Sequence, residues 1–376
     1  FGHVSEGRQV QEPGGRTDTV AEPSVSISLG IMKAARERMG RGLSVSTSGR
    51  TKVGHEKSIK TTTEAEVAKR YKLGGMVMES TNTGMDVVWA TRLADNVQCV
   101  VKTRKKAESF KSATDERMWR STTEVQLSMP KIDSLCQYFE VLETPERYLV
   151  IMEKVDGKDL YEQMEEKRMR HVDAREVVRQ TLIAVKVMHE SGRIHKDLKA
   201  ENVMVDIPSA GSSKALAVHA QRLADGGDPA SPASVKLIDF DTVEDWEPMS
   251  PKAKDVLGTD GYIAPEAYLG NYSPASDIYS IGVVMYKLIT GVFPSREDIF
   301  DDKPGENWVG SPAMQRIHDR LKTEKMDFTK PPLDKCTEAA DLCAKLLRFN
   351  AEDRLSADDA LKHDWFLVDS SKLPDK

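Results

Sequence analysis

The chain of 376 residues is 39% hydrophobic and 30% charged, with a formal net charge of -6. This is the balance of an ordinary globular protein, and the length allows one large domain or two lobes with an extension. The acidic balance argues against nucleic-acid binding, which requires an excess of basic residues. The cysteines are scattered without a C-x-x-C pair, which excludes a disulfide scaffold and favours a reducing compartment.

Residues 1–66 are polar and poor in aromatic side chains. Such a segment buries too little apolar surface to offset the entropy lost on ordering, so we expect a disordered or regulatory extension. Its basic stretch from Ile31 to Arg41 allows two interpretations, an amphipathic helix that contacts a regulatory partner or membrane, or a solvated tail. Without a signal peptide or an apolar run of about 18 residues, we expect a cytoplasmic protein with no transmembrane segment. The lack of an initiating methionine indicates a piece of a longer chain.

Beyond residue 66, short β-like runs give way to helical segments. Apolar runs at 87–89, 97–101 and 148–152 surround a charged helical stretch at 115–129, and the chain turns mostly helical after Gly157. The sequence therefore predicts an α+β fold with two lobes. The first is small and β-rich with one main helix, and the second is larger and mostly helical. The expected boundaries are 67–155 for the first lobe, 156–368 for the second, 207–234 for a surface insertion and 369–376 for a tail.

The segment from Ile194 to Asn202, IHKDLKAEN, suggests a chemistry. It resembles the catalytic loop of eukaryotic protein kinases, H-R-D-L-x-x-x-N, with lysine in place of arginine. Phosphoryl transfer requires mainly positioning and charge neutralisation from a protein. The resemblance implies that Asp197 orients the substrate hydroxyl and accepts its proton, that Asn202 binds Mg²⁺, and that Lys199 contacts the γ-phosphate.

Four further motifs follow in the order of the same family. The run VKLIDFD from Val235 to Asp241 resembles the strand that leads into D-F-G, which implies that Asp239 is a second Mg²⁺ ligand. The other matches are the segment ending in A-P-E, the helix whose aspartate supports the catalytic loop, and the arginine that pairs with the A-P-E glutamate: Gly258 to Glu266, Asp277 and Arg354.

In the first lobe, the run CVVK ending at Lys102 fits the strand whose lysine contacts the α- and β-phosphates. The resemblance implies a glutamate on the following helix as the catalytic partner of Lys102. Glu124 is expected in this role because the apolar residues Val125 and Leu127 follow it, and Glu116 is the alternative.

Counting back from Lys102 places the glycine-rich loop of the family at residues 80–87. Gly84 is the only glycine in this window. The three glycine positions of the motif hold Ser80, Asn82 and Met85. Because glycines let a loop backbone approach phosphates closely, we expect a differently shaped lid and weaker nucleotide binding, with Gly84 in the nucleotide site.

The same resemblance implies an adenine site. Met152 is expected to guard its back pocket, and the Glu153 and Val155 backbones to bond adenine. The apolar residues expected above and below the ring are Val87, Val100 and Met204, with ordinary core residues as the alternative. Asp159, at the edge of this site, and Glu201 stand where basophilic family members read an arginine before the phosphoacceptor, which predicts an R-x-x-S/T consensus.

Two substitutions predict unusual regulation. Lys196 replaces the arginine that binds an activating phosphate, and Asp255 stands at the usual phosphosite, so we expect a permanent clamp between them. A solvated loop acid is the alternative for Asp255. Asp241 replaces the final glycine of D-F-G, from which we expect less freedom to flip and an altered metal preference that includes Mn²⁺.

The leading hypothesis is a serine/threonine kinase that uses ATP and Mg²⁺ on protein substrates. The ending from Arg354 to Phe366 resembles the calcium/calmodulin-dependent and the plant and protist calcium-dependent kinases, although no EF-hand loop occurs in this sequence. One alternative is a pseudokinase scaffold or allosteric partner, favoured by the missing glycines. The other is a small-molecule kinase, which would not need the peptide-docking segment from Gly258 to Glu266.

Overall fold

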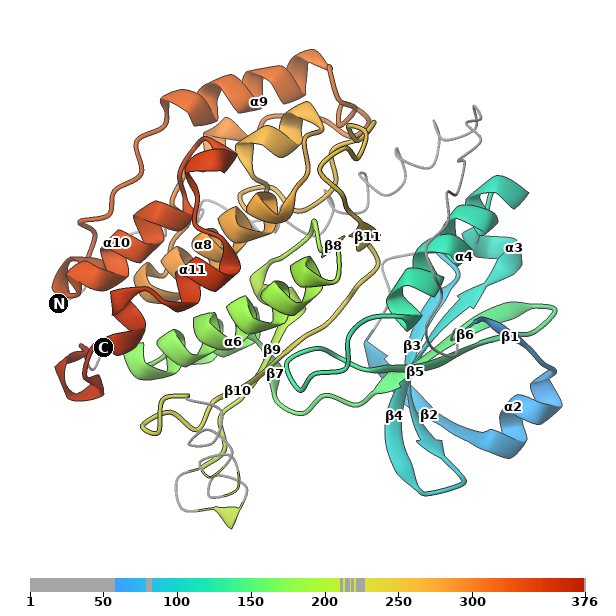
Figure 1. The fold of residues 1–376 in the computed structure, drawn as a ribbon. Helices are drawn as coiled ribbons and strands as arrows, with labels where there is room; N and C mark the ends of the chain where they lie inside the picture. Colours follow the sequence, from blue (N-terminus) through green and yellow to red (C-terminus); the bar gives the residue numbers. More distant parts are fainter. Residues whose placement is uncertain are drawn as a thin grey trace, which may run out of the picture.

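The computed structural model describes residues 58–78, 83–209, 212–213, 217, 220 and 227–374. These residues form a small lobe built on a sheet and a larger, mostly helical lobe, which lie on opposite sides in Figure 1. The predicted α+β bilobal fold is confirmed. No helix in the described ranges is long and apolar enough to cross a membrane. The expected basic helix at Ile31 to Arg41 lies outside these ranges.

The first lobe has a sheet of order β1-β5-β6-β4-β3-β2, with three helices. The strands are β1 (Lys60–Thr61), β2 (Tyr71–Met78), β3 (Met85–Arg92), β4 (Val97–Lys105), β5 (Tyr138–Glu143) and β6 (Arg147–Glu153). The helices are α2 (Glu64–Arg70), α3 (Lys106–Ser109) and α4 (Ala113–Leu127). Ser112 caps α4 by accepting a hydrogen bond from the Asp115 N–H.

The strand period of two divides this sheet into a core face and a site face. Val87 pairs with Lys102 across β3 and β4, and Val100 pairs with Met152 across β4 and β6. Cross-strand partners share a face and so do residues two apart, so these four side chains lie on one face. The opposite face carries the buried residues Ala90, Cys99, Val101 and Ile151, which form a core cluster with Val67 of α2.

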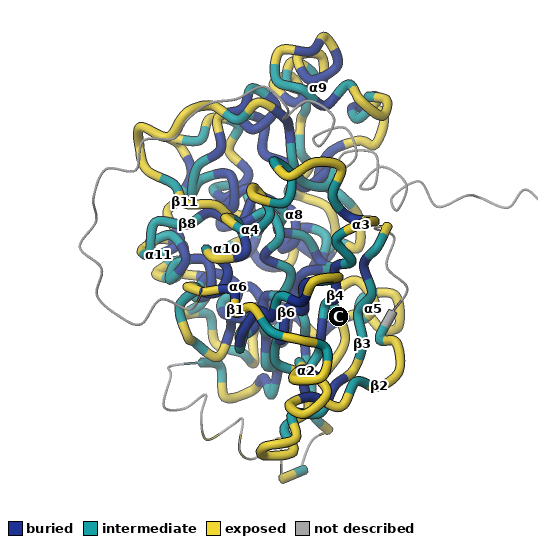
Figure 2. The backbone as a smooth tube through the Cα atoms, turned by 90° about the vertical axis from the view of Figure 1, so that its right-hand side faces the viewer, coloured by how far each residue is buried: buried dark blue, intermediate teal, exposed yellow. Residues whose placement is uncertain are grey.

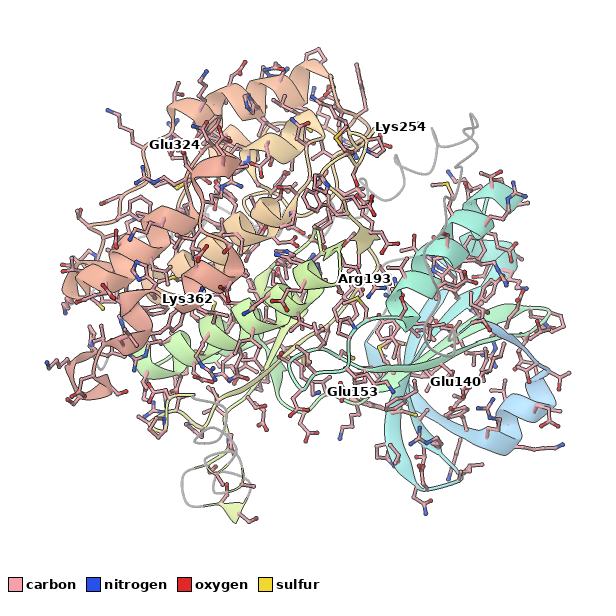
Figure 3. All side chains as sticks on the ribbon, viewed as in Figure 1. Glu140, Glu153, Arg193, Lys254, Glu324 and Lys362 are labelled. Carbon is pink, nitrogen blue, oxygen red and sulfur yellow. The ribbon has the colours of Figure 1, made fainter. Side chains whose placement is uncertain are left out.

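The first lobe begins earlier than residue 67. β1 pairs in parallel with β5, and α2 starts at Glu64. Glu140 of β5, labelled in Figure 3, accepts hydrogen bonds from Lys60, Arg70 and Tyr71. The boundary at residue 66 is therefore wrong for residues 58–66, because ion pairs, strand pairing and the burial of Ile59 in the core order this mostly polar segment.

The second lobe is built around α6 (His171–Glu190) and α8 (Pro274–Thr290), where buried backbone gathers in Figure 2. Its other α-helices are α5 (Leu160–Glu166), α9 (Pro312–Thr323), α10 (Thr337–Leu346) and α11 (Ala357–Leu361). Its short strands are β7 (Lys158–Asp159), β8 (Arg193–Ile194), β9 (Val203–Asp206), β10 (Ser234–Leu237) and β11 (Glu244–Asp245). Its 3₁₀ helices are η1 (Ala200–Asn202), η2 (Pro265–Leu269), η3 (Glu297–Ile299), η4 (Leu333–Lys335), η5 (Ala351–Asp353), η6 (Asp364–Leu367) and η7 (Ser370–Lys372).

Arg175 of α6 holds both the end of the insertion and the tail, through a buried ion pair and hydrogen bonds. The Arg175 guanidinium of α6 lies 2.5 Å from Asp228 and also donates to the Val368 carbonyl, and the Ser370 hydroxyl donates to Asp228 at 2.9 Å. Residues 227–234 and the first residues after 368 are therefore packed parts of the second lobe. The sequence did not predict these contacts of the insertion and the tail, because Arg175 is a long-range partner that periodicity does not reveal.

Candidate active site

Asp277 of α8 fixes the backbone of the loop between β8 and η1. Its carboxylate oxygens accept hydrogen bonds from the His195 and Lys196 N–H groups, each at 2.9 Å. Burial favours a raised pKa for Asp277, but the hydrogen bond from His189 and the neighbouring charges lower it, so the carboxylate stays ionised. Lys196 has a φ of 73°, a left-handed bend in the loop. The loop is thus held from behind by a buried charge.

Asp197, which follows this bend, is the centre of a polar cluster. Its Oδ1 accepts a hydrogen bond from the Thr259 hydroxyl at 2.9 Å, and its Oδ2 lies 3.4 Å from Lys199 Nζ. Lys199 Nζ also donates to the Thr259 hydroxyl at 2.9 Å, and Asn202 Nδ2 donates to the Asp197 carbonyl at 2.7 Å. The structure therefore brings together the three residues predicted from the catalytic loop.

Thr259 is a member of this cluster that sequence analysis did not name as a site residue. The only signal was its place after Gly258 in the segment that ends at Glu266. Gly258 has a φ of 123°, and a Cβ there would lie 3.0 Å from the Lys196 carbonyl oxygen. A glycine at this position lets the segment pass close to the catalytic loop and present Thr259 to Asp197.

Lys102 contacts two carboxylates that follow β10. Its Nζ lies 2.6 Å from Asp241 Oδ2 and 3.2 Å from Asp239 Oδ1. Burial favours a lowered pKa for Lys102, but the two carboxylates outweigh burial and raise it. Burial likewise favours a raised pKa for Asp239, but Lys102 lowers it. Lys102 and Asp239 are therefore both charged at neutral pH.

The expected partnership of Lys102 and Glu124 is wrong. Glu124 is exposed, and within the described residues Lys102 forms its ion pairs with Asp239 and Asp241. The alternative, Glu116, bonds to the Tyr148 hydroxyl at 2.5 Å instead. The apolar residues after Glu124 indicated a helix face, but α4 turns Gln126 and Leu127 inward, and Glu124 lies off that face.

Asp239 and Asn202 lie on adjoining segments, and their donor atoms suit Mg²⁺. The Ile238 N–H bonds to the Asn202 carbonyl at 3.0 Å, which joins the two segments. The Asn202 amide nitrogen is bound to the Asp197 carbonyl, so the side-chain oxygen of Asn202 would be its metal ligand, together with the Asp239 carboxylate. Within the described ranges, no group of three His, Cys, Asp or Glu side chains could hold a metal ion. A site with only two protein ligands is compatible with Mg²⁺, because this ion commonly completes its coordination shell with water and substrate phosphates.

The residues expected around adenine come from both lobes. Val87, Val100 and Met152 are half-buried on the site face of the first-lobe sheet, and Met204 of β9 in the second lobe is half-buried as well. The Glu153 N–H is bound to the Gln137 carbonyl at 2.9 Å, so its carbonyl remains for a ligand. The Val155 backbone has no hydrogen-bond partner among the described residues and stays a predicted adenine contact.

Gly84 has a structural reason to be glycine. Its φ is 74°, and a Cβ would lie 2.6 Å from Glu108 Cβ and 2.7 Å from Ser109 Oγ of α3. Its backbone carbonyl accepts a hydrogen bond from the Lys105 N–H at 2.8 Å. Close packing against α3 therefore explains why residue 84 is a glycine. Ser80 and Asn82, two of the expected loop positions, lie outside the described residues.

Two acids expected to read the substrate have different surroundings. Asp159 caps α5, since its Oδ1 accepts a hydrogen bond from the Glu162 N–H at 2.8 Å. Glu201 keeps one buried carboxylate oxygen, Oε2, without a hydrogen-bond partner in the described part of the chain. Of the two, Glu201 is the better placed to receive a cation.

The expected clamp between Lys196 and Asp255 is wrong, because a different acid pairs with Lys196. Lys196 Nζ lies 2.9 Å from Glu244 of β11 and 4.7 Å from the centre of the Tyr272 ring. β11 pairs with β8, which places Glu244 opposite Ile194 and so near the catalytic loop. Asp255 instead pairs with Trp308 in an isolated β-bridge. Strand pairing decided which acid reaches the lysine.

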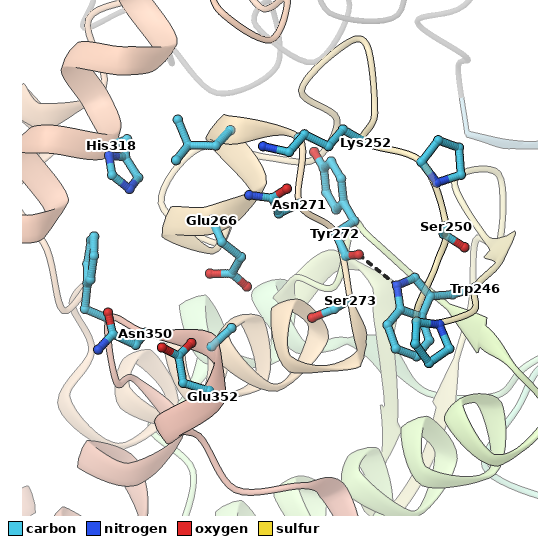
Figure 4. Close-up of a pocket in the computed structure, with 16 residues that line it drawn as sticks. Trp246, Ser250, Lys252, Glu266, Asn271, Tyr272, Ser273, His318, Asn350 and Glu352 are labelled. Carbon is cyan, nitrogen blue, oxygen red and sulfur yellow. Dashed lines mark hydrogen bonds between the residues drawn. The ribbon is translucent and has the colours of Figure 1, made fainter.

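The expected pair of Arg354 and Glu266 is present. Both guanidinium nitrogens lie 2.7 Å from the Glu266 carboxylate oxygens. Beside it lies a hollow of about 440 Å³, shown in Figure 4, which is rimmed by Trp246, Lys252 and His318. The Trp246 indole donates to the Tyr272 carbonyl at 2.9 Å, a bond drawn in Figure 4. Lys102 and Asp197 do not line this hollow, so the charged site described above is separate from it.

Comparison with known proteins agrees with this geometry. Residues 83–366 match the protein kinase domain. Calcium-dependent protein kinase 4 of Plasmodium berghei is 28% identical over 264 residues, which cover 70% of this chain and 43% of that protein. Calcium/calmodulin-dependent protein kinase type IV of Mus musculus is 32% identical over 261 residues, 68% of this chain and 48% of that protein. Calcium-dependent protein kinase 24 of Arabidopsis thaliana is 26% identical over 260 residues, 69% of this chain and 38% of that protein.

The chain spans less than half the length of each of these relatives. The domain match covers more than half of this chain and includes every residue of the polar cluster around Asp197 and Lys102. The resemblance to the calcium-dependent and calcium/calmodulin-dependent group is confirmed by these relatives. This chain therefore belongs to the protein kinase family, with its protein kinase domain at residues 83–366.

Proposed function

We propose that this chain transfers the γ-phosphate of ATP to serine or threonine of protein substrates. The observation that carries the proposal is the convergence of Asp197, Lys199 and Thr259 within hydrogen-bond distance, with Asp197 and Lys199 on a loop held by Asp277. A positioned carboxylate beside a lysine and a metal-binding pair is the arrangement that phosphoryl transfer requires.

In this proposal each residue has one task. The substrate hydroxyl displaces the Thr259 hydroxyl from Asp197 Oδ1 and gives its proton to that carboxylate. Its oxygen bonds to the γ-phosphorus while the bond to the β–γ bridging oxygen breaks, and ADP leaves. Lys199 and Lys102 neutralise phosphate charge. Asn202 and Asp239 would hold Mg²⁺ or Mn²⁺, which when bound shields the phosphate oxygens and orients them.

We place the adenine of ATP between the two lobes. Val87 and Val100 would lie above the ring and Met204 below it, with Met152 at the back. The carbonyl of Glu153 and the backbone of Val155 would bond its edge. The half-buried state of these apolar side chains supports the assignment, because a ring inserted there would cover surface that is still partly exposed.

We further propose that the substrate carries a basic residue before its phosphoacceptor. The support is the buried Glu201 oxygen, which has no partner within the described residues. A carboxylate in this state is costly unless a cation or a donor satisfies it, and a substrate arginine would do so. Asp159 would assist at the edge of the same surface, although capping α5 already uses one of its oxygens.

A scaffold without phosphotransfer is the second candidate. It is favoured by the observation that no helix carboxylate reaches Lys102 and that only one glycine lies in the expected phosphate loop. The charged site counts against it, because a scaffold does not need Lys102, Asp197, Asn202 and Asp239 in one place.

The deciding experiment measures phosphate transfer from ATP, in the presence of Mg²⁺ or Mn²⁺, to a peptide that carries arginine three residues before serine. We expect transfer by the wild-type chain, and a loss of about 10³-fold or more in Asp197→Asn, as expected for removal of a residue of the reacting unit. A second peptide with alanine for arginine tests the basic preference. A folded wild-type chain that transfers no phosphate with either metal would contradict the proposal and leave the scaffold.

A further inference from the structure

We infer that Asp241 is the positioning residue for Lys102, in place of a carboxylate on helix α4. The lysine is then held by the same short segment that carries Asp239, and its position does not depend on an acidic residue of α4. The inference rests on the proposed function in one respect, namely that Lys102 contacts the phosphates of ATP.

The contact distances favour Asp241 over Asp239 as the main partner of Lys102. The Nζ to Oδ2 distance is 2.6 Å for Asp241, against 3.2 Å to Oδ1 for Asp239. The Lys102 and Asp241 side chains are 18% and 21% exposed, whereas Asp239 is 40% exposed. A short, sheltered ion pair is stronger than an exposed one because water screens it less. Asp241 can hold the lysine while the more open Asp239 keeps oxygens for a cation.

The inward charges of α4 are used elsewhere. Arg120 Nη1 lies 2.5 Å from Glu143 and 2.9 Å from the Tyr148 hydroxyl, and Glu116 bonds to the same hydroxyl. The buried residues of α4 are Thr123, Gln126 and Leu127. None of these is acidic, so this helix is packed in place yet supplies no anion to Lys102.

Phe240 fixes the direction of the two flanking aspartates. Its ring is buried 5.6 Å from the Tyr138 ring and 5.8 Å from the His195 ring, centre to centre. Its carbonyl accepts a hydrogen bond from Gln126 Nε2 at 2.8 Å. Asp239 has a φ of 59°, a bend just before Phe240. With Phe240 held between the lobes, the side chains on either side of it both reach Lys102.

A counter-intuitive consequence follows at residue 241. The related motif ends in glycine, so Asp241→Gly would restore the family sequence. Here it removes the closer partner of Lys102 while α4 offers no replacement, so we expect restoration to impair the enzyme.

The test compares Asp241→Asn, Asp241→Gly and Asp241→Glu with the wild-type chain. Asp245→Asn is the matched control, because Asp245 is exposed and its contact with Arg193 is long at 3.5 Å. We expect Asp241→Asn and Asp241→Gly to lower kcat/KM for ATP about tenfold or more, mainly through KM, while Asp241→Glu retains most activity. The control is expected to stay within about twofold of the wild type.

A second readout does not depend on turnover. Acetic anhydride acylates an amine that is free of its partners, so the rate of Lys102 acylation, followed by mass spectrometry on the folded chain, reports how firmly the amine is held. We expect this rate to rise several-fold in Asp241→Asn, because the amine loses its nearest carboxylate partner, 2.6 Å away in the wild type. The other lysines serve as internal references.

The two readouts separate the failure of each idea. Unchanged or higher kcat/KM in Asp241→Gly, together with unchanged Lys102 acylation in Asp241→Asn, would overturn the inference. An inactive wild-type chain would contradict the proposed function, and the acylation rate alone would then decide for or against Asp241. If the asparagine variant melts early, Asp241→Ser is acylated in its place and judged by the same rate.

Discussion

Lys196 illustrates how one residue can change the way an activation segment is held. Its side chain is only 3% exposed, and its ammonium is satisfied by Glu244 at 2.9 Å and by the face of the Tyr272 ring. An arginine can grip a phosphate with two parallel hydrogen bonds, whereas a lysine acts as a compact point charge. A lysine with a resident acid beside it needs no added phosphate as a partner.

Replacing that acid tests the contact. We expect Glu244→Gln to lower the free energy of unfolding by about 1 kcal/mol, because Lys196 loses its counter-charge although Glu244 is half exposed to water. Urea unfolding measures the change. Glu190→Gln is the control, since that glutamate is exposed and 3.8 Å from Lys186. A loss no larger than that of the control would contradict a structural role for the Lys196–Glu244 pair.

The helical elements of the second lobe assemble the site through buried charged side chains. Asp277 near the start of α8 holds the catalytic loop, and Arg354, which follows η5, holds Glu266 of η2. Arg354 also donates to the Ala275 carbonyl at 2.9 Å, so one guanidinium joins η2, the first turn of α8 and the segment after α10. These contacts fix the position of the segment that carries Thr259 relative to the catalytic loop that carries Asp197.

The Arg354 pair gives the prediction at the scale of elements. We expect Arg354→Met to cost about 3–5 kcal/mol, because it leaves the Glu266 carboxylate largely buried without its partner. Chemical unfolding monitored by fluorescence measures the loss. Arg316→Met, at an exposed pair with Asp301, is the control and should change stability by less than about 1 kcal/mol. Equal losses in the two variants would show that burial of the pair is not what matters.

Over the whole molecule, one buried acid makes stability depend on pH. Burial and the nearby carboxylate of Asp302 raise the pKa of Asp260 to about 7, and the Tyr268 hydroxyl at 3.3 Å offsets this only in part. In the unfolded chain an aspartate titrates near 3.8. Between these values the folded state holds a proton that the unfolded state has lost. Stability from Asp260 is therefore present below about pH 4 and is lost as the pH rises through about 7.

Asp260→Asn should remove this dependence. We expect the variant to be more stable than the wild type at about pH 8, by on the order of 2 kcal/mol, and to lose that advantage towards about pH 5. Thermal melting of both chains across this range is the measurement. Parallel curves for the two chains would contradict a raised pKa at Asp260.

Much of the second-lobe site was predictable from the sequence because it is local. Asp197, Lys199 and Asn202 lie within one short loop, and Asp239 follows directly on a strand, so spacing along the chain preserves their relation. Arg354 and Glu266 are distant in sequence, yet each belongs to a motif whose position in the fold the family resemblance predicts. Ionic partners outside motifs were missed, as Arg175 with Asp228 shows, because nothing local marks them.

The sequence by itself determined the bilobal α+β fold, the family and the residues of the catalytic loop, since strand and helix periodicity and motif spacing are properties of the chain alone. Only the tertiary structure decided which carboxylate each lysine meets. Lys102 meets Asp241 and not Glu124, and Lys196 meets Glu244 and not Asp255. The physical reason is that an ion pair depends on a few ångströms of side-chain position, which helix rotation and strand pairing set after the fold has formed.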